Sequence, residues 1–478
     1  MHLKKKNQIF YTMKQNKGKS TNLIPMISIT ILFFMWGFIT SLNDILIPYF
    51  KGVYNLSHFQ ANIVQFAFFI AYFVGALAFF LLAKKGKDPI HKFGYKTTLE
   101  IGLYIAGTAC MLFTITATLN LGFGIFLLAL FMLGVGLTFL QVAANPFVAM
   151  LGKPDTASSR LNLSQAFNSL GTTLGPALGG YFIFKIFLEN SVGADAVKYP
   201  YLFLGLLLGL LALFIHNTKI KEPQTEKSDN NKNESIFKRT YVWLGALGIF
   251  FYVGAEVSIG SNMVAYLTSV SGGKIAESLA ASYLSYYWGG AMIGRFLGAV
   301  SLSKIKTKLK VLYMGILAVA SFCLIYTINF YLHSLSIENV WYFLIFMLLN
   351  FLCFYLGKGK PARLLAIFAM VNSVLILIGM NILGFAGLWW VWALLAIGLF
   401  NSIMWSNVFT LAIDKLGDRT SEASSILIMM ILGGAILPPL QGLIADLSNS
   451  MTISFIAPLI SYIYLIFYGL KGYSINKK

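Results

Sequence analysis

The chain has 478 residues, of which 58% are hydrophobic and 11% are charged, and its formal net charge is +19. So apolar a composition excludes an ordinary soluble globular protein and indicates a polytopic, all-α membrane protein. The positive charge does not indicate a nucleic-acid partner, because the lysines fall in short clusters between apolar runs, as in the cytoplasmic loops of membrane proteins.

The chain begins with a basic segment and six apolar runs. Residues 1–22 carry several lysines and are expected to form a cytoplasmic tail, because the first apolar run is too long for a signal peptide and lacks a small-residue cleavage site. The six runs are each long enough to cross a bilayer, and they predict an N-terminal bundle over 23–216. They lie near 24–49, 61–83, 97–118, 121–150, 161–187 and 199–216.

The second half contains eight more apolar runs. The polar stretch 217–239 predicts a cytoplasmic central loop, the runs predict a C-terminal bundle over 240–470, and 471–478 is expected to be a cytoplasmic tail. The runs lie near 241–270, 279–303, 310–332, 339–357, 363–383, 386–415, 423–447 and 451–470. Lysine and arginine recur in every second loop, which by the positive-inside rule supports about fourteen spans and two cytoplasmic termini.

The two halves resemble each other, as expected for a duplicated transporter bundle. One block recurs 262 positions later, from 145 to 407, without a gap: Asn145, Phe147, Lys153, Gly171, Pro176 and Gly180 return as Asn407, Phe409, Lys415, Gly433, Pro438 and Gly442. Earlier in each half the offset is only 217, from Gly37 to Gly254. The growth of 45 residues is about two helices with their connections, which predicts an inserted helix pair within about 305–386.

Two acidic residues lie well inside apolar runs, Asp44 in the first and Glu256 in the run 241–270. A charge inside a membrane span costs roughly 3 kcal/mol or more, so each carboxylate is expected to serve a function. We predict that they couple the movement of a cation to that of a solute. An apolar cavity favours a proton on a carboxylate, whereas carbonyl and amide oxygens beside it favour sodium, and both ions stay open for Asp44 and Glu256.

Polar side chains recur at helical spacing on several spans, so that they share a helix face. They are Gln141 and Asn145, then Asn162, Gln165 and Asn168, then Asn401, Trp405 and Asn407. Such faces point to other helices or to a water-filled cavity. Interhelical hydrogen bonding is one explanation, and a sugar site is the other, because amides bind hydroxyls and aromatic rings stack on a sugar face. The candidate rings are Trp36, Tyr252, Tyr287, Trp288 and Trp405.

Enzyme motifs are absent from the sequence. We find no HExxH, CxxC or Walker A pattern, all five histidines lie in loops or at span ends, and the three cysteines lie in apolar runs. We therefore expect no catalysis, no ATP hydrolysis and no cofactor other than a coupling ion. Arg295 lies near the cytoplasmic end of its span, where snorkelling is the expected role and a gating ion pair the alternative.

Three longer motifs carry a family resemblance: Leu42-Asn43-Asp44-Ile45-Leu46-Ile47-Pro48, Gln141-Val142-Ala143-Ala144-Asn145-Pro146-Phe147-Val148 and Gln165-Ala166-Phe167-Asn168-Ser169-Leu170-Gly171. They resemble the fucose, galactose and glucose cation-symporter family, which has the major facilitator fold of two six-helix repeats. The segments 248–257, 286–295 and 400–404 resemble its glucose/galactose branch. The fucose branch has a glutamine in place of Glu256 and a glutamate in place of Gln141, so this chain departs from it at both positions.

The resemblance implies that Asp44 is the coupling carboxylate, with Glu256 as a second one, and that a sodium ion or a proton is carried. The predicted sugar-binding residues are Asn43, Gln141, Asn145, Gln165, Asn168, Asn401 and Trp405. We therefore predict a monomer in the inner membrane that imports glucose or galactose with a cation by alternating access. The alternatives are a proton symporter of L-fucose or an N-acetylhexosamine, a passive sugar facilitator and, from another class, a membrane-embedded enzyme.

Overall fold

The computed structural model describes residues 23–84, 89–151, 157–187, 193–218, 239–301, 307–333, 335, 337–358, 360–387, 389–414 and 420–475. The predicted basic tail 1–22, nearly all of the central loop 217–239 and the last three residues lie outside these ranges. The described part contains helices and connecting turns, and no strand. A helix satisfies its own backbone polar groups, so apolar runs of this length fold as helices in a bilayer.

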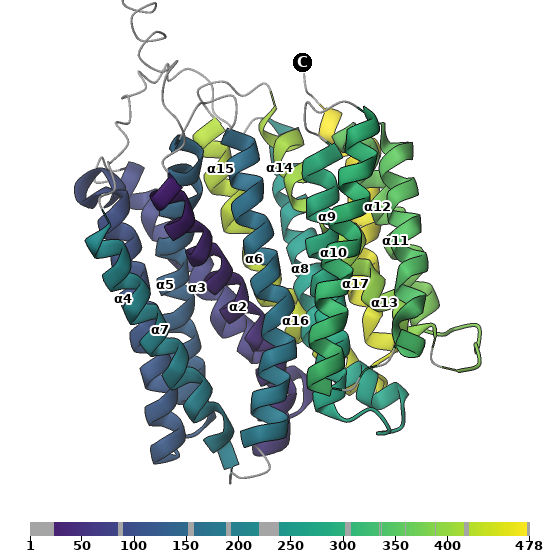
Figure 1. Cartoon of the computed structure of the whole chain (residues 1–478), viewed down its shortest axis with the longest axis horizontal. Helices are drawn as coiled ribbons and strands as arrows, with labels where there is room; N and C mark the ends of the chain where they lie inside the picture. Colours follow the sequence, from purple (N-terminus) through teal and green to yellow (C-terminus); the bar gives the residue numbers. More distant parts are fainter. Residues whose placement is uncertain are drawn as a thin grey trace, which may run out of the picture.

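The helices form two groups that lie side by side (Figure 1). The first contains α2 (Leu23–Tyr54), α3 (His58–Lys84), α4 (Pro89–Leu119), α5 (Phe123–Met150), α6 (Ala157–Gly180) and α7 (Lys198–Asn217). The second contains α8 (Thr240–Val270), α9 (Glu277–Ser301), α10 (Thr307–His333), α11 (Ile337–Gly357), α12 (Pro361–Gly379), α13 (Val391–Asn401), α14 (Met404–Ile413), α15 (Thr420–Met429), α16 (Gly433–Ser448) and α17 (Ile456–Leu470).

Twelve helical segments of the described part are long and apolar enough to cross a membrane, with α13 and α14 together forming one of them. Helices α6 and α9 are as long, with 24 and 25 residues, but less apolar. They pack against each other where the two bundles meet, so less of their surface needs to be apolar. Together these helices agree with the prediction of about fourteen spans.

The packing within one bundle is repeated in the other. Helix α4 lies against α5 and α7, and α2 lies against α6; likewise α12 lies against α13 and α17, and α8 lies against α16. This correspondence leaves α10 and α11 without counterparts in the first bundle. Helix α10 packs along α9, and α11 packs on α13 and α12 at the edge of the molecule (Figure 1). The inserted pair is therefore α10 and α11.

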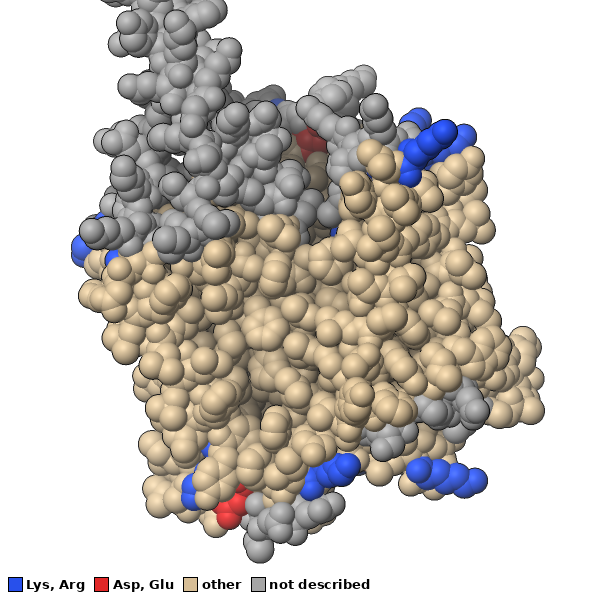
Figure 2. All heavy atoms as spheres, viewed as in Figure 1, with Lys and Arg blue, Asp and Glu red and all other residues tan. Residues whose placement is uncertain are grey.

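The bundles meet along α3 with α16, α6 with α9, and α2 with α8. Helix α2 begins and α17 ends at the same end of the molecule (Figure 1). We name the opposite end, where α2 ends and α3 begins, the outer end, because the lysine pattern predicts that it faces away from the cytoplasm. Figure 2 shows a broad band with no Lys, Arg, Asp or Glu on its face, with the basic side chains at the two ends. This band has the character of a lipid-facing surface.

Local sequence sets where α3 begins. Ser57 and Gln60 form a capping box, in which Gln60 N donates to Ser57 Oγ (3.2 Å) and Ser57 N donates to Gln60 Oε1 (2.9 Å). Two further amides at this helix start, His58 N and Phe59 N, donate to the carboxylate of Asp446 on α16 (2.9 and 2.8 Å). A residue of the second bundle thus caps a helix of the first bundle at the outer end.

Candidate functional site

Asp44 lies in the last third of α2 and accepts three hydrogen bonds. Its Oδ1 atom accepts from Gln65 Nε2 on α3 (2.9 Å) and Ser261 Oγ on α8 (3.1 Å), and its Oδ2 atom accepts from the indole Nε1 of Trp288 on α9 (2.9 Å). Asp44 is only 2% exposed. Two of the three donors belong to the opposite bundle, so this carboxylate links the bundles.

Gly260 allows α8 to come close to this carboxylate. A Cβ atom at this position would lie 2.9 Å from the ring of Trp288 and 3.3 Å from Asp44 Oδ2. A larger residue would therefore push the indole and the carboxylate apart. Because residue 260 has no side chain, the Ser261 hydroxyl and the Trp288 indole can both reach the carboxylate of Asp44.

Among the residues that the structure describes, no lysine, arginine or histidine forms an ion pair with Asp44. The three donors are neutral, and an isolated buried charge is costly without a partner of opposite charge. A proton or another cation bound at Asp44 would remove that cost. The site therefore has the chemistry of a reversible cation-binding position.

Further buried polar contacts lie beside this site, on α3, α8 and α16. Asn62 Nδ2 on α3 donates to Asn262 Oδ1 on α8 (2.9 Å), and Asn262 Nδ2 donates to the Ser258 carbonyl (3.0 Å). Ser258 Oγ donates to Gln441 Oε1 on α16 (2.5 Å). The contact between Asn62 and Asn262 joins the two bundles, as does the cap that Asp446 provides, whereas the contact between Ser258 and Gln441 lies within the second bundle.

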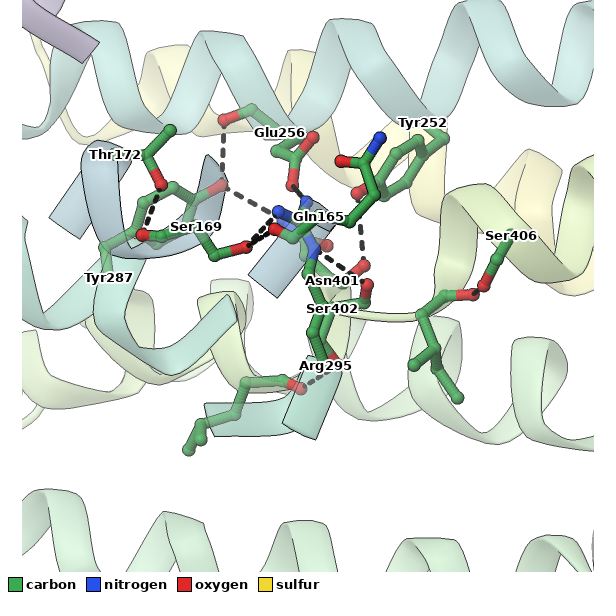
Figure 3. Close-up of polar contacts among 12 residues, drawn as sticks. Gln165, Ser169, Thr172, Tyr252, Glu256, Tyr287, Arg295, Asn401, Ser402 and Ser406 are labelled. Carbon is green, nitrogen blue, oxygen red and sulfur yellow. Dashed lines mark hydrogen bonds and ion pairs between the residues drawn. The ribbon is translucent and has the colours of Figure 1, made fainter. Parts of the chain in front are cut away.

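The second buried carboxylate, Glu256, faces Arg295 (Figure 3). Glu256 Oε1 lies 3.8 Å from Arg295 Nη2, and the two side chains are 11% and 22% exposed. The prediction that Arg295 snorkels to the membrane surface is therefore wrong. Its guanidinium turns inward, because an uncompensated carboxylate in the bundle interior attracts it. We name Glu256 and Arg295 the central pair.

Arg295 also joins the bundles. Its Nη1 donates to Ser169 Oγ on α6, and its Nε donates to the Ser402 carbonyl (3.3 Å) (Figure 3). Gln165 lies one turn before Ser169 on α6, and its carbonyl accepts from Ser169 Oγ (3.0 Å). The central pair therefore lies beside the predicted sugar-binding face of α6.

The two carboxylate sites occupy different depths. Ser261 lies five residues after Glu256 on α8, which is about 7.5 Å along a helix axis. Because α8 runs toward the outer end, the Asp44 site lies nearer that end than the central pair.

Asn401 is enclosed within the second bundle, where its side chain is fully buried. Its Oδ1 accepts from Tyr462 OH (2.7 Å) and Asn372 Nδ2 (3.0 Å), and its Nδ2 donates to Tyr287 OH (3.0 Å). Tyr287 OH in turn donates to the Glu256 carbonyl (2.8 Å). Asn401 thus supports the backbone of Glu256, and its predicted contact with a sugar stays a prediction.

The other predicted amides are placed on inward faces. Gln141 is largely buried, and its carbonyl accepts from Asn145 Nδ2 (3.1 Å), one turn later on α5. Asn168 Nδ2 on α6 donates to the Phe33 carbonyl of α2 (3.0 Å). Gln165, Asn145 and Asn168 are each partly exposed, although Asn145 Oδ1 itself is buried.

Two further predicted residues lie differently. The side chain of Asn43 is fully buried, and neither of its polar atoms has a hydrogen-bond partner in the described part of the chain. Trp405 is half-buried on α14 and stacks on Phe409 at 4.9 Å between ring centroids. Its ring is therefore available on one face only. No group of three or more His, Cys, Asp or Glu suited to a metal ion occurs among the described residues.

Sequence reasoning missed the partners of Asp44, and it gave an ion pair of Arg295 only as the alternative to snorkelling. Trp288, Tyr252 and Tyr287 were candidates for stacking on a ligand, with packing as the alternative, and their polar atoms are engaged in internal hydrogen bonds. Gln65 and Ser261 were not singled out. Each of them is a polar residue within an apolar run, which was the only signal in the sequence. That signal does not identify a partner, because pairing between helices depends on which helix faces meet.

Known proteins match nearly the whole chain. The model of the Major Facilitator Superfamily matches residues 29–380. A glucose/galactose transporter of Brucella abortus is 40% identical over 450 residues, covering 93% of each chain, and a putative glucose/galactose transporter of Helicobacter pylori is 36% identical over 467 residues, covering 95% of this chain and 98% of its own. The crystal structure of the Escherichia coli fucose:proton symporter is 25% identical, with a TM-score of 0.61 over 94% of this chain and 98% of that chain.

Proposed function

The chain belongs to the Major Facilitator Superfamily, and from this premise we propose that it imports glucose or galactose together with a cation by alternating access between its two bundles. The relatives that are named glucose/galactose transporters support the hexose. The single observation that carries the proposal is Asp44, a buried carboxylate of one bundle that is held by neutral donors of the other.

This arrangement couples cation binding to bundle movement. Closing the outer end buries Asp44 against Ser261 and Trp288. Burying the ionised carboxylate without a counter-ion is costly, whereas burying a neutralised one is not. Closure is therefore favoured once a cation has bound from outside, and the cation then leaves toward the cytoplasm with the sugar.

The geometry favours a proton as this cation. A carboxylate has about four acceptor positions, and three at Asp44 are taken by N–H and O–H donors. One position remains, which is enough for a proton. A hard metal cation would require several oxygen ligands and a rearrangement of the donors. The similarity to a fucose:proton symporter supports the same ion.

We place the sugar between the bundles at the central pair. Glu256 Oε1 and Asn145 Oδ1 are buried in this conformation and have no hydrogen-bond partner among the described residues, although Glu256 Oε1 faces Arg295. A movement of the bundles that admits the sugar would let both oxygens accept its hydroxyls. Gln165 and Gln141 supply amide groups of both kinds. Trp405 offers an aromatic face for the ring. Arg295 supplies the positive partner of Glu256 in this conformation, which leaves Asp44 as the coupling carboxylate.

The remaining properties follow from the sequence pattern. We propose that the protein lies in the inner membrane with both termini in the cytoplasm, because basic residues alternate between the loops. We propose that it works as a monomer, because each transport site lies between the two bundles of one chain.

The test is uptake of radiolabelled D-glucose into proteoliposomes with a proton gradient, a sodium gradient or neither. Wild-type protein is expected to concentrate glucose when the outside is acidic, and Asp44→Asn is expected to lose concentrative uptake. Glu100→Gln is the matched control, because Glu100 pairs with His216 away from the contact between the bundles.

Each other result assigns a different function. Accumulation that follows sodium alone would replace the proton by sodium, and equilibration independent of any gradient would indicate a passive facilitator. A wild type that does not transport glucose or galactose would direct the same assay to L-fucose and N-acetylhexosamines.

A further inference from the structure

We propose that Asn350, on the inserted helix α11, is a positioning residue for the central pair, so that the inserted helix pair belongs to the transport machinery. This inference rests on the proposed function in so far as the central pair binds the sugar. It starts from the break between α13 and α14 and leads from there to Glu256 and Arg295.

The break lies at Ser402 and Ile403, between the end of α13 and the start of α14. A helix that ends inside a membrane protein leaves its last carbonyl groups without their usual partners, and such groups are costly unless another donor reaches them. Asn350 Nδ2 donates to the Leu399 carbonyl (3.0 Å). Ser402 Oγ donates to the same carbonyl (2.8 Å).

The next carbonyls of the break are satisfied by residues at the site. Tyr252 OH on α8 donates to the Asn401 carbonyl (3.1 Å), and Arg295 Nε on α9 donates to the Ser402 carbonyl (3.3 Å). Three helices, α11, α8 and α9, thus each supply one side chain to this short segment. Of these donors, only Asn350 comes from outside the two six-helix repeats.

The break in turn holds both members of the central pair. Asn401 Nδ2 donates to Tyr287 OH, and Tyr287 OH donates a hydrogen bond to the Glu256 carbonyl. The Ser402 carbonyl accepts from Arg295 beside its contact with Glu256. A shift of residues 399–402 would therefore move Glu256 and Arg295 relative to each other.

The burial of Asn350 is unusual for its helix. Its side chain is fully buried, whereas Leu348 and Tyr355 on the same helix are 72% and 79% exposed, as expected for residues that face lipid. Close packing supports the same contact, because a Cβ atom on Gly294 of α9 would lie 2.6 Å from the Leu399 carbonyl oxygen. The amide therefore reaches into the core at the break between α13 and α14.

The test compares Asn350→Leu with Asn329→Leu. Leucine keeps the size of the side chain and removes the donor. Asn329 is the matched control because it anchors the other inserted helix, α10, through Ser282 and Ser285 of α9 and has no contact with the break. Hydrogen exchange of peptides covering 398–404 is measured in nanodiscs, and the hexose concentration for half-maximal uptake is measured in proteoliposomes.

We expect Asn350→Leu to speed exchange at 398–404 and to raise the half-maximal hexose concentration about fivefold, the effect of one lost hydrogen bond. Asn329→Leu is expected to change neither. Equal effects of both variants, or no effect of Asn350→Leu on exchange, would overturn the inference. Ser402→Ala removes the second donor to Leu399 and is expected to act in the same direction, which keeps the test decisive if Asn350→Leu does not fold.

The exchange measurement requires no sugar. If the wild type transported no hexose, the proposed function would fail while faster exchange in Asn350→Leu alone still supported the role of Asn350 at the break. If the wild type transported hexose and both variants resembled it, the inference alone would fail.

Discussion

At the scale of residues, the two buried carboxylates differ in what compensates them. Asp44 has three neutral donors, and Glu256 has the guanidinium of Arg295. A neutral environment permits a proton to come and go, whereas a positive partner favours the ionised form of a carboxylate, which accepts hydrogen bonds from hydroxyls. This difference is the basis of the proposed division of roles, with cation coupling at Asp44 and sugar binding at Glu256.

This difference predicts a double-mutant result at the central pair. Glu256→Gln and Arg295→Gln each leave one charge without its partner, so each is expected to lower the free energy of unfolding. Breaking a fully buried pair costs about 3–5 kcal/mol, and we expect a smaller loss here because Arg295 is partly exposed. The double variant removes both charges and is expected to be more stable than either single variant, although hexose uptake stays at least tenfold reduced. The measurement is unfolding in detergent together with glucose uptake. A double variant with the summed destabilisation of the singles would show that the two side chains do not interact.

At the scale of elements, the start of α3 has two caps of different origin. Ser57 caps it from within the first bundle, and Asp446 caps it from the second bundle. Only the second cap must break when the outer end opens. It therefore favours the conformation in which that end is closed.

Asp446→Ala is expected to shift the protein toward the conformation that is open at the outer end. Loss of a helix cap costs about 1 kcal/mol, which corresponds to a change of about fivefold in the equilibrium between the two conformations. Spin labels at Gly124→Cys and Lys274→Cys, on the outer ends of the two bundles, would report the distance by electron paramagnetic resonance. Ser57→Ala is the control, because it removes the cap within one bundle and is expected to leave the distance distribution unchanged. An identical shift in both variants would mean that the caps act only on helix stability.

At the scale of the whole molecule, glycines allow close contact both within and between the bundles. Gly433 contacts the Phe250 carbonyl within the second bundle, whereas a Cβ atom on Gly442 would lie 2.6 Å from the His58 carbonyl oxygen of the first bundle. In the sequence repeat, Gly433 corresponds to Gly171 and Gly442 to Gly180. The first of these repeat positions therefore serves packing within a bundle, and the second serves contact between the bundles.

Gly442→Ala is therefore expected to obstruct closure of the outer end. Overpacking costs about 1–3 kcal/mol, so we expect turnover to fall by about tenfold while the affinity for hexose added from outside is kept. Initial uptake rates and tryptophan fluorescence titrations measure these two quantities. Gly433→Ala is expected to lower the unfolding temperature but to leave both turnover and the affinity for hexose close to wild type. Normal turnover in Gly442→Ala would exclude tight closure at this point.

The sequence alone determined the membrane-spanning character, the helical fold and the duplicated organisation with an inserted pair, and it singled out Asp44 and Glu256, whose roles are proposals. Each of these rests on local properties: apolar runs have to be helical in lipid, and a charge in such a run is costly wherever it points. Family membership and the class of sugar were also within reach of its motifs, and the comparisons with known proteins agree with them.

Only the tertiary structure decided which groups meet these carboxylates. Trp288 and Ser261 reach Asp44 from the opposite bundle, and Arg295 turns away from the membrane surface toward Glu256. Residues so far apart in the chain become neighbours through the packing of α2, α8 and α9, which no local pattern specifies. For the same reason the contact of Asn350 with the broken helix was not visible in the sequence, because it depends on a helix break and an inserted helix lying side by side.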